Sequence, residues 1–153
     1  MNNAKYAAAL KKIELLSVKY KQQMQPPITK DQGEELRKQS VSRLGALPPD
    51  EYTEFLSIHN GLDWDGLSIY ASTRTNIVGH TDREIGGFIE ENLSRRAVTR
   101  WGQILVFGDT GDECYCLDLA HRRFCSIDAV SVERLEEYES FGDMIREAFE
   151  KRA

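Results

Sequence analysis

Two groups of acidic residues are the positions in this sequence where charge could bind a partner or perform chemistry. They are Asp63 and Asp65 with Trp64 between them, and Asp109, Asp112 and Glu113 in the glycine-bearing segment GDTGDE. Carboxylates can ligate a divalent metal or form a general acid–base pair. Asp and Glu are also favoured in loops, where they hydrogen-bond locally. Loop acids without catalytic function are favoured here, and a metal-dependent hydrolase built on them stays open as an alternative.

Trp64 indicates a binding surface more than a catalytic one. An aromatic side chain ringed by acids is typical of the anchors that protein interfaces use. The alternative that the sequence leaves open is a loop tryptophan folded onto the core. We predict that all six residues of the two groups contact a protein partner, with Trp64 as the anchor.

A third cluster contains sulfur and imidazole groups in the pattern C-x-C-x4-H-x3-C, formed by Cys114, Cys116, His121 and Cys125. Structural zinc sites usually draw on a C-x2-C knuckle, whereas C-x-C in a strand places both thiols on one face of the sheet. Three cysteines within twelve positions also fit reduced thiols better than a disulfide framework. We predict small, buried or half-buried thiols and no bound metal, and their role stays open.

Local catalytic motifs are absent from the sequence. It contains no G-x-S-x-G, no Walker lysine loop, no G-x-G-x-x-G and no H-E-x-x-H. His59 lies in the apolar stripe of a predicted helix with no nucleophile nearby in sequence, which favours a packed, hydrogen-bonded histidine. No basic strand with interleaved aromatic residues suggests RNA binding. We predict no catalytic residue, no cofactor and no direct contact with nucleic acid.

The charge is unevenly distributed along the chain. The net charge is -5, but residues 1–40 carry eight Lys and Arg against four Asp and Glu, or +4, which leaves -9 for the remainder. An acidic surface repels nucleic acid and attracts basic proteins, although acidity that only maintains solubility is the commoner case.

The length and hydropathy of the sequence predict one cytoplasmic domain over residues 1–153. A chain of 153 residues with 41% apolar composition can bury one core. No apolar run approaches the roughly 20 residues that a membrane span needs, and the N-terminus lacks the apolar region of a signal peptide. We therefore expect no membrane association.

The N-terminal third of the sequence predicts helices. Apolar residues recur every three or four positions in a lysine-rich background, which predicts an amphipathic helix over residues 1–25, closed by Pro26-Pro27. Its basic face either binds an acidic partner or simply stays in water. Thr29 and Gln32 form a capping-box pattern for a second helix that runs towards Gly45.

A third helix is predicted after Pro48-Pro49, where Asp50 and Glu51 place negative charge at its N-terminus. Gly61 suits the left-handed residue just past the helix end. Asp65-Gly66 then turns the chain in a loop, and residues 67–70 have the high β-propensity of a strand.

The second half of the sequence predicts strands followed by a closing helix. Residues 71–83 are predicted as loop with a short strand over 76–79, and residues 88–97 as a short helix. Residues 104–107, 114–119 and 124–130 predict three adjacent strands in an antiparallel meander. Ser140 is the expected N-cap of the last helix. This pattern predicts an α+β domain with N-terminal helices and a C-terminal helix packed on an antiparallel-rich sheet.

The blocks LPPDEYTEFLSIHNG, GLSIY, ILVFGDTGDECYCLDL and ESFGDMI, in this order from Leu47 to Ile145, resemble the successive blocks of the SUKH superfamily. This superfamily includes bacterial toxin-immunity proteins and a yeast regulator of cell-wall assembly. The resemblance implies an α+β core over residues 47–149. In bacteria it also implies a non-enzymatic protein that binds and neutralises a cognate polymorphic toxin, often a nuclease.

An acidic protein suits such a partner, because a nuclease attracts phosphates with Lys and Arg. The alternative is a non-catalytic regulatory or scaffold module that binds an endogenous protein through its basic first helix. The sequence does not identify the toxin or fix the oligomeric state.

Overall fold

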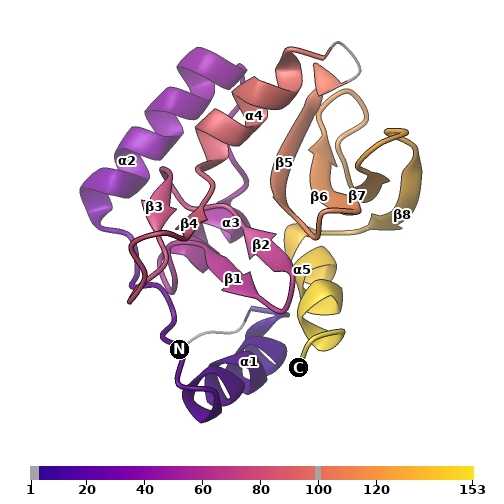
Figure 1. Cartoon of the computed structure of the whole chain (residues 1–153). Coiled ribbons are helices and arrows are strands. Elements are labelled where there is room, and N and C mark those ends of the chain that lie inside the picture. Colours follow the sequence, from indigo (N-terminus) through magenta and orange to yellow (C-terminus); the bar gives the residue numbers. More distant parts are fainter. Residues whose placement is uncertain (1–3, 99–100) are drawn as a thin grey trace.

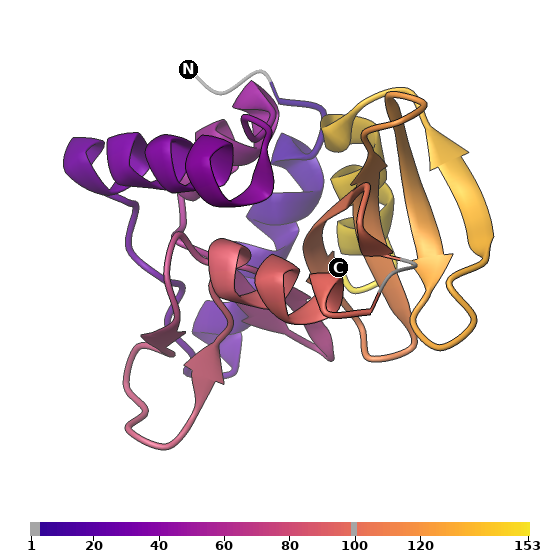
Figure 2. The ribbon, with the colours of Figure 1, turned by 90° about the horizontal axis from the view of Figure 1, so that it is seen from above.

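The computed structural model describes residues 4–98 and 101–153 and confirms the α+β class (Figure 1). The helices of the described residues are α1 (Ala7–Lys19), α2 (Lys30–Gln39), the π-helical turn η1 (Ser40–Leu44), α3 (Asp50–Leu56), α4 (Phe88–Arg96) and α5 (Phe141–Glu150). Figure 2 shows α1, α2 and η1 on one side of the molecule and a β-meander on the other.

Strands of the described residues form one six-stranded antiparallel sheet and a small hairpin. The sheet has the order β1-β2-β5-β6-β7-β8, and the hairpin pairs β3 (Thr75–Asn76) with β4 (Glu84–Ile85). The six strands are β1 (Leu62–Trp64), β2 (Leu67–Ile69), β5 (Ile104–Asp109), β6 (Glu113–Asp118), β7 (Arg123–Asp128) and β8 (Arg134–Tyr138). The predicted three-strand meander is confirmed as β5, β6 and β7. Strand β8 was not predicted, because most of its residues are exposed and it lacks an apolar alternation.

The N-terminal helices follow the sequence signals but are shorter than predicted. Helix α1 covers residues 7–19 of the predicted range 1–25, and residues 1–3 of that range lie outside the described residues. The capping box of α2 is confirmed, since Thr29 and Gln32 exchange hydrogen bonds of 2.8 and 3.1 Å. Gly45, with a φ of 78°, closes η1 in the left-handed conformation.

The segment after α3 differs from the prediction. Helix α3 ends at Leu56, so Gly61, with a φ of 89°, turns the chain further along instead of capping the helix. Residues 62–64 form strand β1, where a loop was expected. Asp65 and Gly66 both have positive φ (49° and 80°), which is the two-residue turn that joins twisted antiparallel strands. The Asp-Gly pair therefore closes a β-hairpin.

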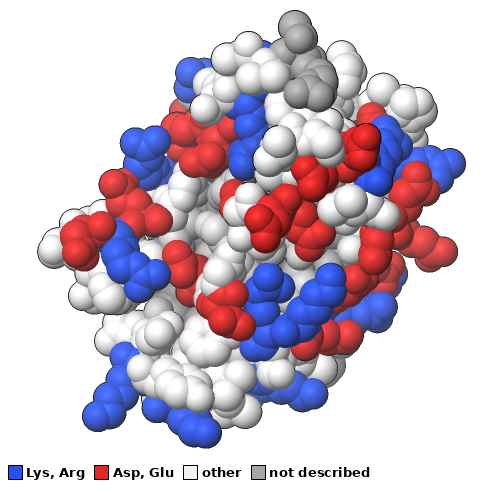
Figure 3. All heavy atoms as spheres, turned by 45° about the vertical axis from the view of Figure 1, so that its right-hand side comes forward, with Lys and Arg blue, Asp and Glu red and all other residues white. Residues whose placement is uncertain are grey.

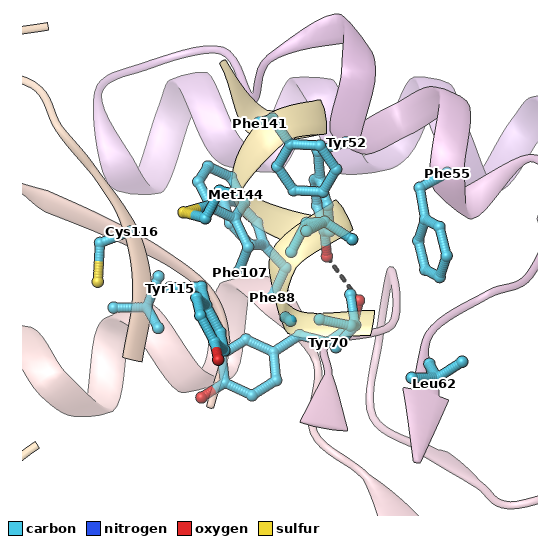
Figure 4. Close-up of a cluster of buried hydrophobic side chains, with 14 of the residues drawn as sticks. Tyr52, Phe55, Leu62, Tyr70, Phe88, Phe107, Tyr115, Cys116, Phe141 and Met144 are labelled. Atoms are coloured by element: carbon cyan, nitrogen blue, oxygen red, sulfur yellow. Dashed lines mark hydrogen bonds between the residues drawn. The ribbon is translucent and has the colours of Figure 1, made fainter. Parts of the chain in front are cut away.

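An aromatic cluster packs helices α3, α4 and α5 against the sheet (Figure 4). The ring of Tyr52 lies 5.1 Å from those of Phe88 and Phe107 and 5.7 Å from that of Phe141. Its buried hydroxyl donates a hydrogen bond of 2.6 Å to the carbonyl of Tyr70. This bond pairs the buried hydroxyl of Tyr52 and fixes the end of β2 relative to α3.

Gly108 permits the close contact between β2 and β5. A Cβ atom at this position would overlap the carbonyl oxygen of Ser68 and lie 2.9 Å from Cδ1 of Ile69. Both contacts come from β2, which pairs with β5 through Ser68–Asp109 and Ile69–Gly108. The hairpin β1–β2 can join the meander only because residue 108 has no side chain.

We predict that Gly108→Ala lowers the free energy of unfolding by about 3 kcal/mol, because the added methyl group forces β2 away from β5. Gly111→Ala is the control: it has open space around its Cβ but a φ of 93°, so it should cost only about 1 kcal/mol of left-handed strain. Chemical denaturation measures both. Equal losses for the two variants would contradict a steric requirement at Gly108.

Candidate functional site

Three turns lie together at one end of the six-stranded sheet, and we call them the turn end. They join β1 to β2 (residues 65–66), β5 to β6 (residues 110–112) and β7 to β8 (residues 129–133) (Figure 1). The strand register places them there, because Ser68 pairs with Asp109 and Glu113 pairs with Asp128. Residues more than sixty positions apart in sequence thus share one rim of the fold.

The turn end gathers acidic residues from all three connections. Its acids lie in the turns or at the strand ends directly beside them. They are Asp65, Asp112 and Glu113, which were predicted from the sequence, together with Asp128 and Glu133, which were not. The last two were missed because strand β8 was not predicted, so no turn was expected before it. Arg152 is a base at this rim, and its Nε donates a hydrogen bond of 3.2 Å to the carbonyl of Asp65. Glu133, Asp65 and Asp112 are exposed.

Backbone hydrogen bonds hold two of these turns in fixed positions. The amide of Ala129 donates to the carbonyl of Asp112 at 2.9 Å, which ties the β7–β8 turn to the β5–β6 turn. The carboxylate of Asp128 accepts from the amides of Ser131 at 2.8 Å and Val130 at 2.9 Å. These bonds lower the pKa of Asp128, so its carboxyl group stays charged at neutral pH. The charges therefore lie on a preformed surface.

Val130 is an apolar residue exposed at the centre of the β7–β8 turn. Its side chain is 84% exposed, and Val132, two positions later, has a φ of 61°, which is unusual for a β-branched residue. Val130 is thus an exposed apolar side chain beside acids, which is the arrangement predicted for Trp64.

Trp64 lies in strand β1 instead of a polar loop, and it packs onto the core. Its side chain is only 9% exposed, and its Nε1 donates a hydrogen bond of 3.1 Å to the carbonyl of Arg152. Strand alternation explains the difference, since Leu62 and Trp64 face inward while Asp63 faces out. Trp64 is therefore a tryptophan folded onto the core, which is the alternative that the sequence left open.

Asp109 points into the protein, where it belongs to a polar network. Its carboxylate accepts a hydrogen bond from the hydroxyl of Tyr70 and lies 3.4 Å from Nη2 of Arg95. The Arg95 guanidinium in turn stacks over the rings of Tyr70 and Trp101, at 5.5 and 5.7 Å. Burial raises the pKa of Tyr70, so its hydroxyl keeps the proton that it donates. Asp109 thus links β5 to α4.

Asp63 lines a groove beside the turn end, and Trp64 and Asp65 line the same groove. The Asp63 carboxylate pairs with Arg83 at 3.3 Å, across this groove of about 760 Å³ between the end of α1, the β1–β2 hairpin and residues 77–83. The groove also has Tyr20 and His80 in its walls. Of the six predicted residues, Asp65, Asp112 and Glu113 lie at the turn end. Asp65 also lines the groove together with Asp63 and Trp64. Asp109 is half-buried at the base of the β5–β6 turn.

The cysteines are free, buried and close together on the sheet, as predicted. Cys116 pairs directly with Cys125 across β6 and β7. Burial raises the pKa of all three thiols, to about 11 for Cys125. His121 instead contacts the carboxylate of Asp118 at 3.0 Å. Within the described residues, no group of three or more His, Cys, Asp or Glu is placed to hold a metal ion.

His59 is packed and hydrogen-bonded, as predicted. Its Nδ1 lies 2.7 Å from the carbonyl of Gln25, and its Nε2 lies 2.7 Å from the carboxylate of Glu14. These contacts join α1 to the segment that follows α3, so the ring has a structural function.

Acidic and basic side chains are interspersed over much of the surface. Figure 3 shows Asp and Glu next to Lys and Arg on the face that includes the right-hand side of Figure 1. The acidity of the sequence therefore does not form one continuous acidic surface on this face, and local groups such as the turn end carry the negative charge. No helix in the described parts of the chain combines the length and apolarity of a bilayer span.

Comparison with known protein families gives one match. The model of the SMI1/KNR4 family (SUKH-1) matches residues 34–147, which is more than half of the chain. The matched range includes all five acids of the turn end. No curated protein matches the sequence.

We predict that Asp109→Asn lowers the free energy of unfolding by about 1.5 kcal/mol, because Arg95 loses one of its two charged partners, Asp109 and Glu91, in a half-buried network. Asp112→Asn removes a charge from the exposed turn and should change stability by less than about 0.5 kcal/mol. Urea unfolding of both variants measures the difference. Equal changes in the free energy of unfolding would contradict a stabilising contact between Asp109 and Arg95.

We also predict that thiol reagents label the folded protein more than about a hundredfold more slowly than the protein in guanidinium chloride, near neutral pH. Burial keeps the three thiols both protonated and inaccessible. Labelling of any cysteine at the rate of the denatured chain would contradict this arrangement.

Proposed function

Because the chain belongs to the SMI1/KNR4 (SUKH-1) family, which includes toxin-immunity proteins, we propose that it is an immunity-type protein without catalytic activity. It binds and neutralises a cognate polymorphic toxin, for which a nuclease is the best candidate. In this proposal the protein acts in the cytoplasm, and the toxin domain is its partner.

The gathering of acids from three turns at the turn end supports a basic partner. A nuclease must carry Lys and Arg to hold phosphates, so its active surface complements a rigid acidic rim. Opposite charges at such a contact speed association and make it sensitive to salt. The turn end needs no rearrangement to present its charges, because backbone hydrogen bonds already fix two of its turns.

The six residues predicted from sequence take different roles in the proposal. Asp65, Asp112 and Glu113 contact the toxin, and Asp128 and Glu133 join them. Val130 replaces Trp64 as the apolar contact, because it is exposed where Trp64 is buried. Trp64 and Asp109 position the turns from inside, and Asp63 stays with Arg83 in the groove.

A regulatory or scaffold module that binds through α1 is the second candidate function. The outer face of α1 carries Leu15 and Val18, which are 62% and 74% exposed, next to lysines such as Lys11 and Lys19. An apolar stripe edged with lysines fits an acidic protein partner. Deleting residues 1–25 would not test this function, because the inner face of α1 belongs to the core. Leu15→Asp with Val18→Asp is the sharper test.

The proposal predicts a large secreted protein with a variable C-terminal toxin domain encoded directly upstream of this gene, and it is tested by co-expression with that domain. We expect the two proteins to co-purify. The variant Asp65→Asn/Asp112→Asn/Glu133→Gln should associate about tenfold more slowly and with a weaker salt dependence, because it lacks three turn-end charges.

The matched control Asp31→Asn/Glu34→Gln/Glu35→Gln removes three exposed charges from α2 and should change the association rate less than about twofold. Absence of a complex, or equal effects of the two triple variants, would contradict the proposal. Loss of binding only in the Leu15→Asp/Val18→Asp variant would favour the α1 function instead.

A further inference from the structure

Strand β8 is an edge of the six-stranded sheet that lies open to solvent. It pairs with β7 on one side and stands last in the strand order. Its first four residues, 134–137, are exposed, and Leu135 is 51% exposed. An edge strand presents backbone N–H and C=O groups that another chain can bind by adding a strand.

The pairing of β7 with β8 contains an irregularity that directs Leu135 outward. Ser126 pairs with Glu136 and Ile127 with Arg134, so Leu135 has no partner in β7. A bulge of this kind bends the edge and limits regular pairing to the residues that follow it. A short strand could therefore pair with residues 136–138 and contact Leu135 as an apolar neighbour.

The edge formed by β8 and its flanking residues is negatively charged. Residues 133–139 contain four glutamates and one arginine, a net charge of -3. The Arg134 side chain pairs with the buried carboxylate of Asp118, and Glu137 pairs with Arg123 at 2.9 Å. Glu133, Glu136 and Glu139 carry the remaining charge along the edge.

A second copy of this chain fits the edge poorly. Two copies of residues 133–139 side by side would bring eight glutamates to one seam against two arginines, and like charges on facing strands are destabilising. A strand with lysine or arginine opposite Glu136 would instead gain a cross-strand ion pair, with Glu133 and Glu139 adding attraction at the two ends of β8.

We propose that β8 is a docking edge, on which an extended basic segment of the partner adds to the sheet as a further strand. This inference rests on the proposed function, because it assigns the segment to the same basic partner that contacts the turn end. The two surfaces are continuous, since the turn at residues 129–133 leads directly into β8. Main-chain pairing gives the edge its affinity, and the glutamates select a basic strand.

The first experiment uses a defined probe, a short capped peptide of alternating lysine and valine, with a glutamate–valine peptide as its charge control. Isotope-labelled protein is titrated with each peptide, and amide hydrogen exchange is followed by NMR. We expect the basic peptide to slow exchange at outward-facing amides within residues 134–138, and the acidic peptide to leave them unchanged.

Variants then separate edge binding from general attraction. Glu136→Lys/Glu139→Lys should weaken binding of the basic peptide at least about tenfold. The control Glu34→Lys/Glu35→Lys makes the same charge change on exposed positions of α2 and should alter binding less than about twofold. Thermal melts check that each variant folds. If a variant does not fold, the location of slowed exchange in the unsubstituted protein decides whether the peptide binds at β8.

Three results would overturn the inference: slowed exchange elsewhere than β8, equal weakening by both double variants, or slowed exchange in β8 that grows with protein concentration alone. The last result would assign the edge to a second copy. Failure here is distinguishable from failure of the proposed function, because the co-purified toxin would still respond to the turn-end variant and not to Glu136→Lys/Glu139→Lys.

Discussion

The antiparallel register between β2 and β5 is the constraint on which the candidate site depends. It pairs Ser68 with Asp109, and it exists because Gly108 leaves room for the backbone of β2. Through this register the β1–β2 hairpin joins a meander that begins about forty residues later in the chain. If the two strands were separated, the turn at Asp65 would lose its place beside the turn at Asp112, and the acids would no longer form one rim.

The protein uses its carboxylates in two distinct ways. Asp109 faces the interior, where Tyr70 and Arg95 compensate the cost of half-burying it. Asp65 and Asp112 face solvent, where their charge is available to a partner. The surface of mixed charge follows from the composition, since 20 Lys and Arg accompany 25 Asp and Glu. A small group of acids at one end of the sheet can still define a partner's chemistry.

Much of the fold could be predicted from local signals, whereas the site could be predicted only in part. The Thr29–Gln32 capping box, the Ser140 cap and the Asp65-Gly66 turn each act through neighbouring residues, so their positions are visible in the sequence. Strand β8 depends on pairing with β7, and its glutamates have low β-propensity, so it was missed together with Asp128 and Glu133. The burial of Trp64 likewise depends on the distant C-terminal segment after α5, where Arg152 supplies the carbonyl that its indole contacts.

The central claim is that the turn end contacts a basic protein. Hydrogen–deuterium exchange of the chain with and without its co-purified toxin domain tests it most directly, because exchange locates the contact without any substitution. We expect slowed exchange at residues 65–66, 110–113 and 129–133, with residues 77–83 and the outer face of α1 unchanged. Slowed exchange confined to residues 77–83 or to α1, with the turns at 110–113 and 129–133 unaffected, would contradict the claim.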